Sequence, residues 1–325
     1  MSGAYHVPVM PDEVMDALAI RPGGVYVDCT VGGGGHSALM LNKLREAGGE
    51  GKLIGIDRDA DAIDAATDRL REYINDGYAR LIRANFHGIK QILVGESVEK
   101  VDGILMDLGV SSHQLDTPER GFSYKTNTAN TVDAPLDMRM DMSHDVTAAR
   151  LVNGMTQDEL ARIFYEYGEE RWAKRIAEFI VCERKREPIL TAARLVGIID
   201  AAVPKAVRQS DSAHPARRVF QALRIAVNDE LAPLGRVLAD CVECLAPGGR
   251  LAVITFHSLE DRIVKQTFAN LRRPCECPAS FPICVCGKKP LISGDFRNHI
   301  APSKDETLRN PRSASAKLRV AVRLG

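Results

Sequence analysis

The sequence predicts an α/β fold in which a mainly parallel sheet is interrupted by a helical insertion. Short apolar runs alternate with helical segments over the first third of the 325 residues. The alternation stops after Leu108 and resumes near Ala216, and the apolar spacing between these points is helical. Because strands separated by helices pair in parallel through right-handed crossovers, we expect the two alternating parts to form one sheet.

Each element is predicted from its apolar spacing and from the signals at its ends. In the first part, strands are expected at residues 25–29, 53–57, 79–84 and 101–108, with a helix at 60–75. In the middle part, Thr156 and Glu159 form a capping box, and Thr191 caps a further helix that ends near Pro204. In the last part, we expect helices at 216–231 and before Leu245, a Pro-Gly-Gly turn at 247–249, and strands at 251–256 and 318–323, the latter as a closing edge strand.

These elements divide the chain into three segments. Residues 1–112 are expected to form the first part of the α/β domain, and residues 113–213 a mainly helical inserted domain. Residues 214–325 complete the α/β domain and carry a cysteine-rich loop and a basic tail.

The composition is that of a globular protein, with 45% hydrophobic and 26% charged residues. We expect a cytoplasmic protein without a membrane partner, because no apolar run reaches roughly 18 residues and the N-terminus lacks a signal-peptide pattern. A net charge of zero argues against a general nucleic-acid coat protein. Residues 287–325 nevertheless contain nine Lys or Arg and three acidic residues, which suits either a phosphate backbone or a solvated surface.

A glycine-rich turn is the most informative motif. The strand at 25–29 runs into Gly32-Gly-Gly-Gly35, followed by His36, and the next strand ends on Asp57. Glycines let a ligand approach the backbone at a helix N-terminus, and an acid after the second strand accepts hydrogen bonds from ribose hydroxyls. A dinucleotide motif would place a third glycine at Ser37, so the pattern favours S-adenosylmethionine (SAM) over a nicotinamide cofactor.

Acidic residues end three of the predicted strands: Asp28, Asp57 and Asp107. Ligands of open parallel sheets bind beyond the carboxyl ends of the strands, so these side chains are expected to face one crevice. Each one alone is equally explained as a turn or helix-capping aspartate. Phe86 follows the third strand and would either stack on an adenine ring or belong to the core.

Polar residues also follow the strand at 251–256, in Phe256-His-Ser-Leu-Glu-Asp-Arg262, and are expected to line the substrate side. A serine hydrolase is disfavoured because the sequence has no Gly-x-Ser-x-Gly elbow. Two Cys-x-Cys pairs form a separate motif, made of Cys275, Cys277, Cys284 and Cys286. Two explanations stay open for it: a structural zinc site of four thiolates, or free thiols in a turn-rich loop.

Motifs along nearly the whole chain resemble the RsmH (MraW) family of SAM-dependent methyltransferases. They include Tyr26-Val-Asp-Cys-Thr30, Asp107-Leu-Gly-Val-Ser-Ser112, Pro135-Leu-Asp-Met-Arg-Met-Asp141, Phe220-Gln-Ala-Leu-Arg-Ile225 and Asn310-Pro-Arg-Ser-Ala-Ser-Ala-Lys-Leu-Arg319. The resemblance implies a Rossmann-like methyltransferase sheet with an inserted helical domain for substrate recognition. It also implies that the chain methylates the exocyclic N4 of a cytosine in the decoding region of 16S ribosomal RNA, cytosine 1402 in the family's naming.

The resemblance further implies which residues and partners take part. The family's SAM contacts map onto Gly34, Gly35, His36, Asp57, Phe86, Asp107 and Gln114. The implied partner is 16S rRNA, within the small ribosomal subunit, and a homodimer stays open. We expect Asp107 to accept an N–H of the target amino group, although the family mapping assigns it to SAM.

Three rival functions are considered. A SAM-dependent methyltransferase acting on another RNA or on a small molecule would share the glycine turn, and a small-molecule enzyme would not need the basic tail. A nicotinamide dehydrogenase fits Ser37, Asp28 and Asp107 poorly. A non-catalytic RNA-binding module has no use for a nucleotide crevice with three acids.

Overall fold

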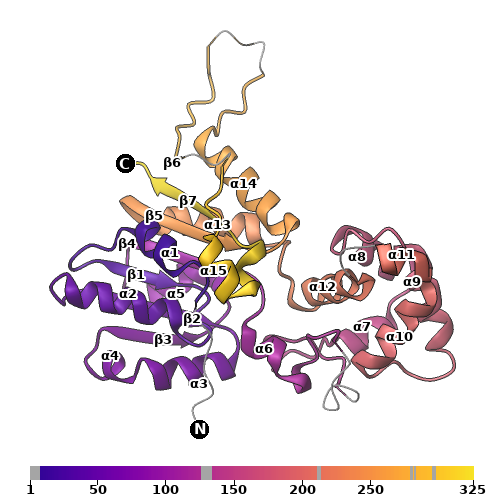
Figure 1. The fold of residues 1–325 in the computed structure, drawn as a ribbon. Coiled ribbons are helices and arrows are strands. Elements are labelled where there is room, and N and C mark those ends of the chain that lie inside the picture. The colour runs from indigo at the N-terminus through magenta and orange to yellow at the C-terminus, as the bar shows by residue number, and fades with distance from the viewer. Residues whose placement is uncertain (1–7, 126–133, 211–213, 279–280, 282, 295–297) are drawn as a thin grey trace. The chain divides into compact units, whose positions relative to one another are not determined.

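Figure 1 shows the fold in a computed structural model, which describes residues 8–125, 134–210, 214–278, 281, 283–294 and 298–325. The chain forms two compact units. The sheet unit comprises Met1–Gly109 and Leu231–Gly325, and the helical unit comprises Val110–Glu230. No helix within the described residues is long and apolar enough to cross a membrane.

A seven-stranded sheet forms the centre of the sheet unit, in the order β3-β2-β1-β4-β5-β7-β6. The first five strands pair in parallel, while β7 runs antiparallel to both β5 and β6. Since the chain winds outward in both directions from β1 and β4, these two strands flank the switch point of the sheet, where α/β proteins bind ligands. The strands are β1 (Val25–Asp28), β2 (Lys52–Asp57), β3 (Ala79–Arg83), β4 (Val101–Asp107), β5 (Leu245–Thr255), β6 (Ile292–Ser293) and β7 (Lys317–Arg323).

Helices cover both faces of this sheet. Tyr26 and Leu105 are buried on the face that carries α1, α2 and α4, whereas Val27 and Ile104 are buried on the face that carries α5, α13 and α14. Neighbouring residues therefore contribute to opposite cores, as the two-residue period of a strand requires. The helices of this unit are α1 (Pro11–Leu18), α2 (Gly35–Glu46), α3 (Ala60–Arg69), α4 (Arg71–Asn75), η1 (Phe86–Gly88), α5 (Ile89–Gly95), α13 (Leu234–Cys244), α14 (Ser258–Arg272), α15 (Lys304–Arg309) and η3 (Pro311–Ser315).

Three elements of the sheet unit differ from the sequence prediction. The single helix expected at 60–75 is broken into α3 and α4 at Leu70, which leaves the helical conformation and is fully buried. Strand β5 begins at Leu245 and continues through the expected Pro-Gly-Gly turn, where its pairing with β4 shifts register. Strand β7 is not a sheet edge, because β6 adds outside it.

The helical unit has its own hydrophobic core, in which Leu160, Phe164 and Ile176 are fully buried. Its α8 begins at the expected capping box of Thr156 and Glu159, and Thr191 caps α10 as expected. Its helices are α6 (Ser112–Asp116), η2 (Pro118–Arg120), α7 (Ala148–Gly154), α8 (Gln157–Glu166), α9 (Ala173–Glu183), α10 (Ala192–Ala202), α11 (Lys205–Ser210) and α12 (Pro215–Asn228).

The second boundary between the units lies later than the sequence suggested. We expected the α/β domain to resume at residue 214, but the structure divides the chain between Glu230 and Leu231. The reason is α12, whose apolar residues Val219 and Leu223 are fully buried in the core of the helical unit. Helical spacing alone cannot tell which of two cores an amphipathic helix covers.

Candidate functional site

The three strand-ending acids lie at one edge of the sheet. Asp28 ends β1, Asp57 ends β2 and Asp107 ends β4, and these strands are parallel neighbours. Their carboxyl ends therefore meet at the same edge, next to the glycine turn that leads into α2.

Asp28 stabilises the turn from within. One carboxylate oxygen accepts a hydrogen bond from the Ser37 hydroxyl at 2.8 Å, and the other accepts the Thr30 backbone N–H at 3.1 Å. Burial raises the pKa of Asp28 to about 6. Both carboxylate oxygens of Asp28 thus accept hydrogen bonds from within the chain, and the bond to Ser37 connects the start of α2 to the end of β1.

Asp57 is hydrogen-bonded to the first glycine of the turn. Its Oδ2 accepts the backbone N–H of Gly32 at 2.9 Å, and its Oδ1 accepts the backbone N–H of Asp59 at 2.9 Å. Burial raises the pKa of Asp57 to about 6. Each carboxylate oxygen has a second lone pair, so the side chain can hold the turn and still accept hydrogen bonds from a vicinal diol.

The glycine turn needs its glycines for two reasons. Gly32 and Gly34 adopt φ angles of 51° and 74°, in the left-handed region that side chains disfavour. Gly34 is also the N-cap of α2, and a Cβ there would lie 3.4 Å from the backbone of Ala66. The turn therefore brings the N-terminus of α2 close to α3 and leaves the backbone accessible at the switch point.

Asp107 presents an acceptor without a partner. Its Oδ1 is buried and makes no hydrogen bond within the described part of the chain, while its Oδ2 lies 3.8 Å from Nδ1 of His36. The Nε2 atom of His36 lies 2.8 Å from the carbonyl oxygen of Val9, which fixes the ring. Burial raises the pKa of Asp107 to about 6, and the nearby His36 opposes that rise.

Thr30 is a positioning residue that the sequence did not reveal. Its hydroxyl oxygen accepts the backbone N–H of Asp107 at 2.7 Å and so joins the ends of β1 and β4. The same residue donates its own N–H to Asp28. Its partner lies 77 residues away in the sequence, and a threonine after a strand carries no signal of such a contact. Ser37 was noticed only as a missing glycine, yet it is the hydrogen-bond donor to Asp28.

Comparison with known proteins identifies the family. The model of the MraW methylase family matches residues 3–324. The chain belongs to the MraW methylase family. A ribosomal RNA small subunit methyltransferase H from Symbiobacterium thermophilum is 53% identical and covers 98% of this chain and 97% of the relative. Another from Geobacter sp. (strain M21) is 51% identical over the whole of both chains.

The family match confirms the resemblance drawn from the motifs, and the strand order confirms the Rossmann-like sheet. Among solved structures, a SAM-dependent O-methyltransferase from Thermotoga maritima aligns with a TM-score of 0.42 and 10% identity, covering 100% of this chain and 69% of that one. At that score the likeness adds nothing to the strand order already described.

Two residues of the family's SAM set lie apart from the glycine turn in the sequence. Phe86 begins η1 after β3, and its ring packs partly against the sheet core while staying partly exposed. Its contact with the core fits the structural role, and its stacking on an adenine ring stays a prediction. Gln114 lies in the helical unit, where its side chain accepts the Ser111 backbone N–H in a capping box. Its contact with SAM stays a prediction.

The polar segment after β5 is mainly structural. Glu260 is buried and forms a capping box with His257 at the start of α14. Asp261 binds Arg319 through two contacts, 2.7 Å to Nε and 3.2 Å to Nη2, and also lies 3.3 Å from Lys317. Glu260 and Asp261 are thus held by contacts within their own chain, while the charge of Glu260 also helps to raise the pKa of Asp107. That these side chains line the substrate side stays a prediction.

The basic tail is likewise only partly available to a phosphate backbone. Arg319 is buried, and both Arg319 and Lys317 pair with Asp261 because β7 lies inside the sheet. In the helical unit, Arg184 donates to the carbonyl of Val152 at 2.7 Å, so this basic side chain is also bound within the chain. The number of basic residues in the sequence is thus larger than the number of basic side chains that this MraW-family fold leaves free of partners within the chain for RNA phosphates.

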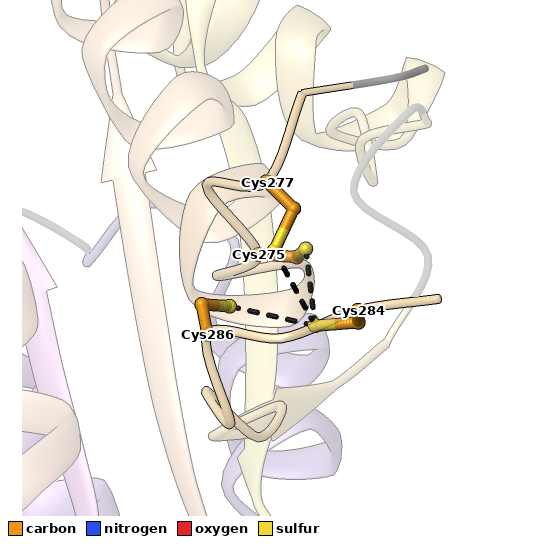
Figure 2. Close-up of side chains that lie close together, drawn as sticks. All are labelled: Cys275, Cys277, Cys284 and Cys286. Atoms are coloured by element: carbon orange, nitrogen blue, oxygen red, sulfur yellow. Dashed lines mark hydrogen bonds between the residues drawn. The ribbon is translucent and has the colours of Figure 1, made fainter. Parts of the chain in front are cut away.

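The four cysteines of the two Cys-x-Cys pairs lie together in the segment between α14 and β6 (Figure 2). Their sulfur atoms all lie within 4.8 Å of one another. They are distant in the chain from the glycine turn and from the strand-ending acids of the MraW-family sheet. The sequence left a shared metal site and free thiols both open, and the structure brings all four sulfurs together.

Proposed function

We propose that this chain is a SAM-dependent methyltransferase that acts on the N4 atom of a cytosine in the decoding region of 16S rRNA, cytosine 1402 in the family's naming. The observation that carries the proposal is the buried, unpartnered Oδ1 of Asp107 at the switch point of the sheet. The printed names of the full-length relatives support ribosomal RNA of the small subunit as the substrate.

The residues at the sheet edge fit SAM. The predicted contacts are Gly34, Gly35, His36, Asp57, Phe86, Asp107 and Gln114. Asp57 keeps lone pairs for two ribose hydroxyls while it holds the turn, and Phe86 offers an accessible ring for adenine. When bound, SAM supplies an activated methyl group.

Asp107 would polarise the nucleophile. The lone pair of the cytosine amino nitrogen is delocalised into the ring, so the nitrogen attacks poorly. A carboxylate that accepts a hydrogen bond from one of its N–H groups favours tetrahedral geometry at this nitrogen. The same carboxylate then takes the proton that the amine must lose after methylation. With a pKa of about 6, Asp107 is ionised at neutral pH. Thr30 positions this residue by accepting its backbone N–H, and His36 lies beside its carboxylate.

The helical unit is proposed to recognise the RNA. A base within a stacked strand cannot present its amino group in line with a methyl donor, so the target nucleotide must leave its stack. Contacts to phosphates by exposed basic residues such as Lys185 would position the flanking strand and make binding salt-dependent. Whether two copies of this chain form a dimer is tested by gel filtration.

Transfer of labelled methyl groups from SAM to purified 30S particles tests the proposal, with naked 16S rRNA in parallel. We expect one labelled nucleotide, which digestion and mass spectrometry should identify as N4-methylated cytosine. Label confined to another nucleotide would refute the assignment.

The role of Asp107 is tested separately by the Asp107→Asn variant, with the exposed Asp64→Asn as a matched control. We expect turnover at saturating SAM to fall about a hundredfold or more, since general acid–base groups contribute on that order. SAM affinity should change much less. Normal turnover with weakened SAM binding would assign Asp107 to the cofactor alone.

A further inference from the structure

The described residues of the loop between α14 and β6 form no hydrophobic core of their own. Its base is closed by the backbone N–H of Leu291, which donates to the carbonyl of Leu271 at 2.9 Å. Among the described residues between these two, no side chain is buried. Phe281, Ile283 and Val285 are even exposed, by 49%, 75% and 72%. Packing therefore cannot hold this loop in one shape, and another interaction is needed.

The four thiols have the spacing of a single tetrahedral site. Cys284 Sγ lies 3.4 Å from Cys275, 3.9 Å from Cys277 and 3.5 Å from Cys286 (Figure 2). A zinc–sulfur bond of about 2.3 Å in a regular tetrahedron places neighbouring sulfurs about 3.8 Å apart. The observed distances lie around that value. Hydrogen bonds between neutral thiols would link the sulfurs in pairs and would not require all four to surround one point.

Other uses of the four thiols fit this arrangement less well. A disulfide joins two sulfurs at about 2.0 Å and leaves no reason for Cys284 to lie within 3.9 Å of three partners. A cluster of several irons binds its thiolates to different metal atoms and so spreads them beyond one tetrahedron. Glu276, the acid between the first two thiols, is paired with Lys288 at 2.5 Å. The donor set is therefore four sulfurs with no open position, as in structural zinc sites.

Backbone amides support negative charge on these sulfurs. The N–H of Val285 donates to Cys277 Sγ at 3.3 Å. The backbone N–H groups of Lys288 and Glu276 also donate hydrogen bonds to Cys286. Such hydrogen bonds around a metal site stabilise and orient the thiolate ligands.

We propose that Cys275, Cys277, Cys284 and Cys286 bind one structural zinc ion, which joins the two arms of the loop at residues 273–290. The metal takes the place of the missing core and presents the exposed apolar side chains around it in a fixed arrangement. This site is independent of methyl transfer, because none of its ligands belongs to the glycine turn or to the strand-ending acids.

Metal analysis of the full-length protein, purified under reducing conditions without chelator, tests the proposal. We expect about one zinc per chain, and loss of that zinc in the Cys284→Ser variant. Cys182→Ser is the matched control, because Cys182 is an exposed thiol on α9, and it should retain the metal. Wild-type protein without zinc, with iron in its place, or with the four thiols paired in disulfides would overturn the assignment.

Two further readouts do not depend on activity. Trypsin should cut after Lys288 roughly tenfold faster in Cys284→Ser than in Cys182→Ser, because local opening exposes the loop. If Cys284→Ser fails to fold, titration of the wild-type thiols with a mercurial decides, since four thiols should react as one zinc is released. Reaction of these thiols without release of zinc would refute the proposal.

Discussion

Replacing Asp57 by asparagine should remove one hydrogen bond that holds the glycine turn, and the free-energy cost follows from the contacts in the structure. Both carboxylate oxygens accept backbone N–H groups at 2.9 Å, from Gly32 and from Asp59. An amide offers only one oxygen, so either orientation of the asparagine side chain turns its NH₂ group toward one of these N–H donors. One hydrogen bond to a charged acceptor is lost, at a cost of about 1.5–3 kcal/mol. The ribose hydroxyls lose an anionic acceptor as well.

The assay is SAM binding by calorimetry on folded protein at neutral pH. We expect the dissociation constant to rise by roughly 10-fold to 150-fold, which corresponds to about 1.5–3 kcal/mol for the charged acceptor that the ribose hydroxyls lose. The hydrogen bond lost within the turn is missing from free and bound protein alike and lowers the stability of the fold instead. The Asp64→Asn variant, whose carboxylate is exposed on α3, should bind SAM as the wild type does. If Asp57→Asn folds normally and its affinity for SAM stays within twofold of the wild type, Asp57 does not bind the cofactor as described.

Three other predictions concern stability. Because burial raises the pKa of Asp107 from 3.8 to about 6, the native state binds a proton more tightly than the unfolded chain. Its contribution to the free energy of unfolding should fall as pH rises between these values, and urea titrations of Asp107→Asn should lack that part of the fall. Asp261→Asn strands the buried Arg319 and should cost about 3 kcal/mol in urea unfolding; a loss below about 1 kcal/mol would contradict this. Gly121→Ala should cost about 2 kcal/mol or more, because φ is 71° and a Cβ would overlap a backbone carbonyl, whereas Gly154→Ala, which faces open space, should be neutral or slightly stabilising in the same thermal melts.

The sequence was most informative where local pattern determines structure. Strand β2 ends on Asp57 and strand β4 on Asp107 within a residue of expectation, because apolar runs of strand length stop at the first polar side chain. The capping box at Thr156 was also correct, since its hydrogen bonds lie within one helical turn. The short spacing of the four cysteines also indicated a shared metal site as one of two explanations, beside free thiols.

Contacts between distant segments could not be predicted in this way. The hydroxyl of Thr30 accepts a backbone N–H from the end of another strand, and Asp261 binds two residues of β7. Neither pairing leaves a local trace in the sequence. For this reason Arg319 was counted with an exposed basic tail, whereas it is a buried ion-pair partner.

Strands β4 and β5 are hydrogen-bonded neighbours, yet the whole helical unit separates them in the chain. During synthesis, β1 to β4 therefore leave the ribosome as a half-sheet whose β4 edge has no partner until β5 follows. The intervening helices make mainly local contacts and can fold first, whereas the long-range pairing of β4 with β5 forms late. The insertion of the helical unit thus also sets the order of folding, and it makes β4 the strand that most needs protection from aggregation in a nascent chain.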